Sequence, residues 1–132
     1  MTVLIDSNVV IDLATNSEWA DWAAERLEDL SSEPFAINQI VYAEALFSYR
    51  SGEDLDELFS ALGIERLNLP WAAAFPASRA YRTYRERGGS RTSPLPDFYI
   101  GAHAQVAGLT LLTRDARRFR TYFPSLNLVA PD

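Results

Sequence analysis

The chain has 132 residues, 48% of them hydrophobic, which is enough for one domain over residues 1–132 with a buried core. Its formal net charge is −6 and all twelve basic residues are arginine, so enzymes that need a lysine, such as P-loop NTPases and Schiff-base enzymes, are excluded. With no cysteine and one histidine, His103, a zinc site of thiolates or several histidines is also excluded, and any metal must bind oxygen ligands.

Short apolar segments alternate along the chain with segments in which apolar residues recur at helical spacing. The first kind predicts strands at residues 2–5, 35–37, 64–69, 109–113 and 126–130. The second kind predicts helices at residues 9–13, 17–30, 39–50, 54–62, 70–87 and 97–107. This alternation favours an α/β fold with a parallel or mostly parallel sheet, covered by helices on both faces.

Local signals set the ends of several helices. Ser7 or Asn8 is placed to cap the first helix, and Gly63 ends the fourth. Pro76 lies inside the fifth helix, which implies either a kink there or a start later than residue 70. Residues 88–96, rich in glycine, serine and proline, form the clearest loop of the second half.

Four carboxylates stand apart from the solvated acidic clusters. Asp6 follows the first strand, Glu44 lies within the third helix, Asp97 opens the sixth helix, and Asp115 follows the fourth strand. Each has a structural explanation, because the aspartates could cap helices or turns and Glu44 could face water. An isolated carboxylate is costly to bury unless it is paired or bound to a cation, so the four together favour one shared site.

Ligands of open parallel sheets bind beyond the carboxyl ends of the strands, where two of these acids lie. Carboxylates brought together raise one another's pKa, and a hard divalent cation relieves the repulsion. Mg²⁺ and Mn²⁺ bind carboxylate, water and phosphate oxygens. The predicted chemistry is therefore metal-dependent hydrolysis of a phosphodiester.

Four segments of the sequence together resemble a known family. They are Val-Leu-Ile-Asp-Ser-Asn at residues 3–8, Glu44, Pro-Asp-Phe-Tyr-Ile-Gly-Ala at residues 96–102 and Leu-Thr-Arg-Asp at residues 112–115. In this order they look like the acidic quartet of PIN domains. The chain as a whole, from residue 2 to residue 130, resembles the VapC-type toxins of toxin–antitoxin modules.

The resemblance implies a three-layer sandwich with a central, mostly parallel sheet of four or five short strands. It also implies a ribonuclease that uses Mg²⁺ or Mn²⁺, forms a homodimer and is inhibited by a cognate antitoxin protein. The implied site consists of four catalytic, metal-binding acids and two polar supports: Asp6, Glu44, Asp97, Asp115, Asn8 and Thr113.

The charges are divided unevenly along the chain. Residues 1–65 hold 2 arginines and 14 acids, net −12, whereas residues 66–132 hold 10 arginines and 4 acids, net +6. A basic half suits a nucleic-acid substrate better than the overall charge does. Arg87, Arg91 and Arg114 are the candidate contacts with RNA, although Arg114 could equally neutralise an acid.

The histidine and several aromatic residues have structural explanations. Tyr81 and Tyr84 could stack on unpaired bases or belong to the core. His103 lies six residues beyond Asp97, on the opposite helix face, and we interpret it as structural. Three tryptophans are expected mostly in the core, although one or two of them could line a dimer or antitoxin surface: Trp19, Trp22 and Trp71.

Two other functions are compatible with an acid at the end of the first strand of an α/β fold. A haloacid-dehalogenase-like phosphatase would need an acid where the chain has Asn8, and a lysine that it lacks. A non-catalytic module that binds RNA or protein on the same fold is an open alternative, distinguished by binding that EDTA does not affect. The N-terminus lacks signal-peptide features, and no apolar run reaches the roughly 20 residues of a membrane span. We therefore expect a cytoplasmic protein with no membrane partner.

Overall fold

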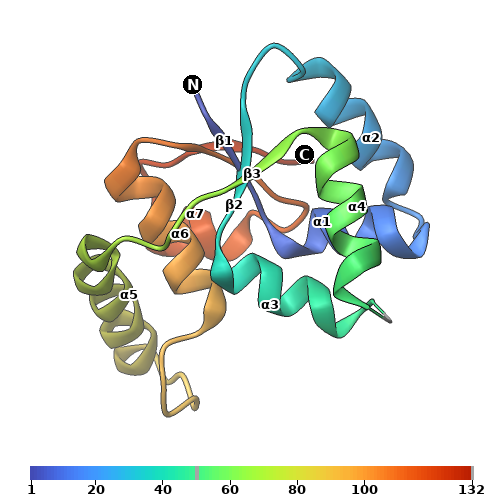
Figure 1. Cartoon of the computed structure of the whole chain (residues 1–132). Coiled ribbons are helices and arrows are strands. Elements are labelled where there is room, and N and C mark those ends of the chain that lie inside the picture. Colours follow the sequence, from blue (N-terminus) through green and yellow to red (C-terminus); the bar gives the residue numbers. More distant parts are fainter. Residues whose placement is uncertain (50, 132) are drawn as a thin grey trace.

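The computed structural model describes residues 1–49 and 51–131. Five parallel strands form one sheet in the order β3-β2-β1-β4-β5 (Figure 1). Their bounds are β1 Val3–Ile5, β2 Phe35–Ile37, β3 Ile64–Arg66, β4 Thr110–Leu112 and β5 Asn127–Val129. The structure confirms the predicted α/β sandwich, and the sheet is wholly parallel.

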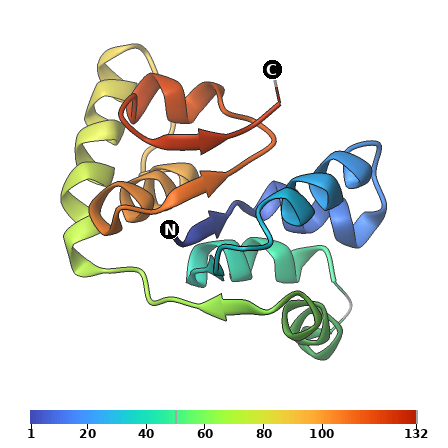
Figure 2. The ribbon, with the colours of Figure 1, turned by 90° about the horizontal axis from the view of Figure 1, so that it is seen from above.

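Seven α-helices and one 3₁₀ helix are present in the described part of the chain. They are α1 Ser7–Thr15, α2 Ala20–Asp29, α3 Gln39–Phe47, α4 Gly52–Leu62, η1 Trp71–Ala73, α5 Ala74–Glu86, α6 Pro96–Ala107 and α7 Arg117–Tyr122. Figures 1 and 2 place α5 and α6 on one side of the strands and α1 and α2 on the other. This arrangement covers both faces of the sheet, as its composition requires.

The core is centred on the three inner strands. Every residue of β1, β2 and β4 is buried, whereas the edge strands β3 and β5 are partly exposed. Strands that are apolar on both sides must be covered on both sides, which explains why these segments lack the alternating pattern of a half-exposed sheet. Strand β1 lies at the centre, so the residue that follows it is held by neighbours on both sides.

Two helix starts differ from the sequence prediction. Helix α1 begins at Ser7, and its N-cap is Asp6, whose side chain accepts a hydrogen bond from the Ser7 backbone N–H. The prediction of Ser7 or Asn8 as the cap was wrong by one or two positions, whereas capping as the structural explanation of Asp6 is confirmed. Helix α2 begins at Ala20 because the Ser17 hydroxyl bonds to Asp12 and to the Trp19 backbone, which holds residues 17–19 in a turn.

Other helix ends follow local chemistry. The Asn38 side chain caps α3 by accepting from the Val41 N–H, and Gly63 ends α4 in the left-handed conformation. Pro76 lies in the first turn of α5, where a missing N–H costs nothing, so the later start is confirmed and no kink is needed. Helix α3 ends at Phe47; its predicted end at Arg50 lies outside the described residues.

Two large aromatic side chains are far from the core. Trp71 is 95% exposed and Phe47 is 93% exposed. Trp71 is therefore the surface tryptophan that the alternative interpretation allowed and not a core residue, because η1 turns its side chain outward from the start of the α5 segment. None of the helices described in residues 1–49 and 51–131 has the length and apolar character needed to cross a bilayer.

Candidate metal centre and nucleic-acid cleft

The carboxyl ends of the neighbouring strands β1 and β4 lie side by side at one edge of the sheet. Strand β1 pairs with β2 on one side and with β4 on the other, so the direction in which successive strands are added to the sheet reverses between β1 and β4. Asp6 follows β1 directly, and Thr113 and Asp115 follow β4. Such a switch point leaves a crevice at the carboxyl edge of a parallel sheet. Two of the predicted acids thus start from neighbouring strands.

Asp6 is the buried acid of this edge, with 3% of its surface exposed. One carboxylate oxygen accepts from the Thr113 hydroxyl at 2.8 Å, and the other accepts from the Ser7 backbone N–H at 2.7 Å. Burial, followed by the charge of Asp97, raises the pKa of Asp6 from 3.8 to about 7. The two hydrogen bonds oppose this rise but do not cancel it, so the site holds a carboxylate that lacks positive charge around it.

Glu44 reaches the same edge from α3 and is half-buried. Its Oε1 accepts a hydrogen bond from the Ser7 hydroxyl at 2.9 Å, which links it to the start of α1. Burial raises the pKa of Glu44, and the charge of Asp97 raises it further. Glu44 therefore faces the shared site rather than open water.

Asp97 lies in the first turn of α6, where the helix dipole favours an acid. Its Oδ2 accepts from Nη1 of Arg118, on α7, at 3.1 Å. Burial raises the pKa of Asp97 in spite of this arginine, and the nearby Asp115 adds to the rise. Asp97 is the link between the acids, because its charge also acts on Asp6 and Glu44.

Asp115 is the exposed member of the group. Its Oδ1 accepts from the Arg117 backbone N–H at 3.3 Å, but the N-cap of α7 is Ala116, so the interpretation of Asp115 as the cap was wrong by one position. Asp115 and Asp97 line a cleft of about 310 Å³ together with the arginines Arg117 and Arg118. The cleft thus combines carboxylates with two cationic side chains.

Asn8 and Thr113 connect α1 to the segment after β4. The Asn8 Nδ2 donates to the Thr113 hydroxyl at 3.3 Å, and the Asn8 Oδ1 accepts from the Arg114 backbone N–H at 3.1 Å. The Asp115 N–H also donates to the Thr113 hydroxyl. These bonds fix Asp6 and the segment that carries Asp115 relative to each other.

The four acids fit a hard divalent cation by chemistry, since all their ligand atoms are carboxylate oxygens and the buried Asp6 forms no ion pair with any arginine that the structure describes. As the side chains stand, however, no three acids or histidines of the described chain are arranged to enclose a metal ion. Asp97 instead accepts from Arg118 and Glu44 from Ser7. Protein donors thus occupy oxygens that the cation would otherwise use.

Comparison with known proteins is consistent with this arrangement. The family model of the PIN domain matches residues 3–123, which includes all four acids. The chain belongs to the PIN domain family. A search of curated protein sequences found no significant match.

Solved structures share the fold of this PIN domain. One is VapBC2 from Rickettsia felis, bound to a promoter DNA fragment, with a TM-score of 0.77, 21% identity and full coverage of both chains. Another is VapBC-1 from nontypeable Haemophilus influenzae, with a TM-score of 0.73, 20% identity and 98% coverage of both chains. A toxin–antitoxin complex from Klebsiella pneumoniae has a TM-score of 0.64, 26% identity and 98% coverage of both chains.

An ion pair beside the site of this PIN domain was missed by the sequence analysis. Asp12, 3% exposed, accepts from Arg114 Nε at 2.6 Å and from the Ser17 hydroxyl at 2.9 Å. The Arg114 guanidinium also lies 5.8 Å from the Trp19 ring centroid. The sequence signal was an acid inside a short apolar helix. The neutralising role considered for Arg114 is thus the one that its side chain adopts.

The two other candidate RNA contacts are exposed. Arg87 ends α5, with its guanidinium 5.9 Å from the ring centroid of Tyr122. Two tyrosines hold the backbone of Arg91. The Tyr81 hydroxyl donates to the Arg91 carbonyl, and the Tyr84 hydroxyl accepts from the Arg91 N–H. The hydroxyls of both tyrosines are thus used to anchor the loop, and their rings pack against the core.

The single histidine has a structural role in the fold. His103 is buried, and its Nδ1 lies 3.0 Å from the Asn38 Nδ2. Because the Asn38 oxygen already caps α3, its amide must donate to the ring, which requires a neutral imidazole with its proton on Nε2. Burial lowers the pKa of His103, in agreement with that tautomer.

Proposed function

We propose that this PIN domain is a metal-dependent endoribonuclease and the toxin of a VapBC-type toxin–antitoxin module. The observation that carries the proposal is the electrostatic coupling of four acids from four separate parts of the chain. Asp97 raises the pKa of Asp6 and Glu44, and Asp115 raises the pKa of Asp97. A fold tolerates such repulsion where a cation offsets it.

The proposed ligands of Mg²⁺ or Mn²⁺ are Asp6, Glu44, Asp97 and Asp115. When bound there, such an ion would supply Lewis-acid polarisation of a phosphoryl oxygen and would lower the pKa of a water molecule. The Thr113 hydroxyl orients the Asp6 carboxylate, and Asn8 holds Thr113 in turn. Arg118 neutralises Asp97 before the cation binds.

The substrate and partners complete the proposal. Arg87 and Arg91 are exposed and are proposed to contact RNA phosphates, and Arg87 lies over Tyr122, which lines the acidic cleft. Arg114 is a third candidate, although it pairs with Asp12. The similar structures include VapBC and toxin–antitoxin complexes, which supports a cognate antitoxin as partner. A homodimer is proposed as well, with the exposed Trp71 as a candidate interface residue. The proposed location is the cytoplasm, where RNA substrates occur.

The purified chain tests the catalytic proposal directly. RNA should be cleaved with Mg²⁺ or Mn²⁺, should survive in EDTA, and should be cleaved again when the metal is restored. Asp97→Asn should abolish cleavage but leave the fold and antitoxin binding intact, whereas the matched change Glu57→Gln, at an exposed position of α4, should have no effect. Full activity of Asp97→Asn would remove Asp97 from the site.

One observation favours the non-catalytic alternative, a module that binds RNA or protein on the same fold. The described acids and histidine do not form a group of three that could hold a metal as they stand. Under this alternative, RNA or protein binding is the same with EDTA and with Mg²⁺, and no RNA fragments appear under either condition. The EDTA experiment therefore separates the two functions.

A further inference from the structure

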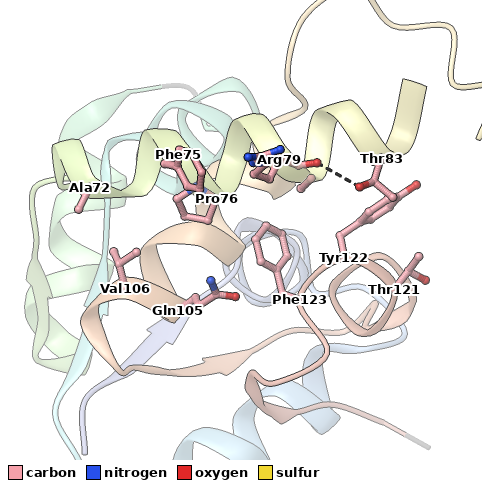
Figure 3. Close-up of a pocket in the computed structure, with 11 residues that line it drawn as sticks. Ala72, Phe75, Pro76, Arg79, Thr83, Gln105, Val106, Thr121, Tyr122 and Phe123 are labelled. Atoms are coloured by element: carbon pink, nitrogen blue, oxygen red, sulfur yellow. Dashed lines mark hydrogen bonds between the residues drawn. The ribbon is translucent and has the colours of Figure 1, made fainter. Parts of the chain in front are cut away.

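A second groove lies next to the acidic cleft. It has a volume of about 510 Å³, within the range of about 300–1,000 Å³ that is usual for ligand sites. Phe75, Arg79 and Thr83 of α5 line one side, and Gln105 of α6 and Phe123, which follows α7, line the other (Figure 3). The groove therefore runs between the outer helix α5 and the helices that carry Asp97 and the Asp115 segment.

The groove and the acidic cleft share part of their walls. Thr121 and Tyr122 line both of them, on the two sides of α7. The Tyr122 ring packs edge-on against Phe98, with 5.1 Å between ring centroids, and Arg87 lies over it. A flexible polymer held at Asp97 and Asp115 would meet the groove as soon as it passed Tyr122.

The side chains of the groove match the chemistry of a single-stranded nucleic acid. Phe75 is 67% exposed, which is unusual for a large apolar side chain unless it serves a surface contact. Arg79 lies with its guanidinium 5.0 Å from the Phe75 ring centroid, so an aromatic face and a cation occur together. Unpaired bases stack on such rings, arginine binds the phosphates between them, and Gln105 offers hydrogen bonds to base edges. The Thr83 hydroxyl already donates to the Arg79 carbonyl at 3.2 Å, but its oxygen can accept a hydrogen bond from a base.

A protein partner fits the groove less well. Among the lining residues, all within the described chain, Arg79 is the one charged side chain and none is acidic. An apolar partner would bury Arg79 without a counter-ion, which is costly. A symmetric contact between two copies would bring together two grooves that each hold Arg79 and no acidic lining residue among the described side chains, so neither arginine would gain a counter-ion from the other groove. RNA brings its own negative charges.

We propose that this groove binds the unpaired bases of the RNA strand next to the phosphodiester that lies in the acidic cleft. The inference rests on the proposed ribonuclease function and deepens it by identifying a binding subsite for single-stranded RNA. The groove is formed by α5, α6 and α7, and it shares Tyr122 with the cleft that holds Asp97 and Asp115.

The affinity of short, labelled single-stranded RNA tests the subsite, measured by fluorescence anisotropy with Ca²⁺ in place of Mg²⁺ to prevent cleavage. Phe75→Ala should weaken binding roughly 5-fold or more, as expected for a lost base–aromatic stack. Phe75→Tyr, which keeps the aromatic ring, should retain most of the wild-type affinity for RNA. Phe47→Ala is the matched control, because it removes an equally exposed aromatic from the end of α3 and should bind like wild type.

Two further measurements make the result decisive. Photocrosslinking with thiouridine-containing RNA should attach the RNA to the peptides that contain Phe75 or Tyr122. Equal affinities of wild type and Phe75→Ala, crosslinks confined to other peptides, or a change in oligomeric state with Phe75→Ala would each overturn the subsite. If wild type cleaves RNA with Mg²⁺ but the groove variants bind normally, only this inference fails. If wild type neither binds nor cleaves RNA, both proposals fail.

Discussion

The Thr113 hydroxyl donates a 2.8 Å hydrogen bond to the Asp6 carboxylate, although the two residues lie 107 positions apart in the sequence. Both side chains are buried, and each directly follows one of the two central strands. The parallel pairing of Ile5 with Leu112 sets this contact. The bond therefore joins the two halves of the sheet at the point where the acids gather.

Thr113→Val should destabilise the fold by about 1–3 kcal/mol, because valine has nearly the same shape but leaves the buried Asp6 without one of its donors. Loss of that donor also raises the pKa of Asp6 further, so Mn²⁺ binding at neutral pH should weaken. Urea unfolding and calorimetric titration with Mn²⁺ measure the two effects. Thr15→Val, at an exposed position of α1, should change the free energy of unfolding by less than about 0.5 kcal/mol. Equal losses for both variants would contradict this role of Thr113.

The raised pKa of Asp6 predicts that the metal-free fold loses stability as the pH rises. The folded chain releases the Asp6 proton near pH 7, whereas the unfolded chain releases it near 3.8. Between these values the folded state holds more protons, so its stability falls by roughly 1.4 kcal/mol per pH unit at most. Below 3.8 both states are protonated and the contribution is constant. Urea unfolding in EDTA from pH 5 to 8 measures the slope.

Asp6→Asn is the control for this pH dependence, since it removes the titrating group while keeping the shape. The slope that disappears in the variant belongs to Asp6. The comparison is needed because the pKa of His103 is lowered, so His103 gives the pH dependence of stability a slope of the opposite sign. Its stabilising contribution is lost as the pH falls below about 6.5. An unchanged slope in Asp6→Asn would show that other groups cause it. With Mn²⁺ present, wild-type affinity should increase from pH 6 to 8, because the cation competes with the proton.

The sequence predicted the features that depend on local chemistry. Short apolar segments such as residues 35–37 are typical of buried strands in a parallel sheet. An acid that directly follows such a strand, as Asp6 does, lies at the carboxyl edge of the sheet. The pairing of side chains was not predictable, because it depends on where helices pack. Arg118 belongs to a segment for which no helix was predicted, yet α7 brings it to Asp97. The exposure of Trp71 was not predictable either, because an apolar side chain favours burial but does not specify which way a short helix faces.

The buried pair of Asp12 and Arg114 is the clearest case of such a missed contact, and it predicts a loss of stability. Asp12→Asn should lower the free energy of unfolding by about 2 kcal/mol. This value is below the range for fully buried pairs because the Arg114 side chain is 34% exposed and water can solvate it. The matched change Glu86→Gln breaks the exposed pair with Arg82 and should cost less than about 1 kcal/mol. Denaturant midpoints give both numbers, and similar values would mean that burial adds nothing to the Asp12 pair.

Gly101→Ala should destabilise the fold even though alanine is the better helix former. A Cβ at Gly101, in the middle of α6, would lie 2.6 Å from the ring of Phe123, which is itself buried and unable to move aside cheaply. Overpacking of this kind costs about 1–3 kcal/mol, against a gain of about 1 kcal/mol in helix propensity, so a net loss is expected. Gly52→Ala, in the first turn of α4, is the control, because its Cβ meets neighbours at an ordinary 3.7 Å and should be neutral or stabilising. Thermal unfolding of both variants decides the matter, and a more stable Gly101→Ala would mean that Phe123 does not pack against α6 as described.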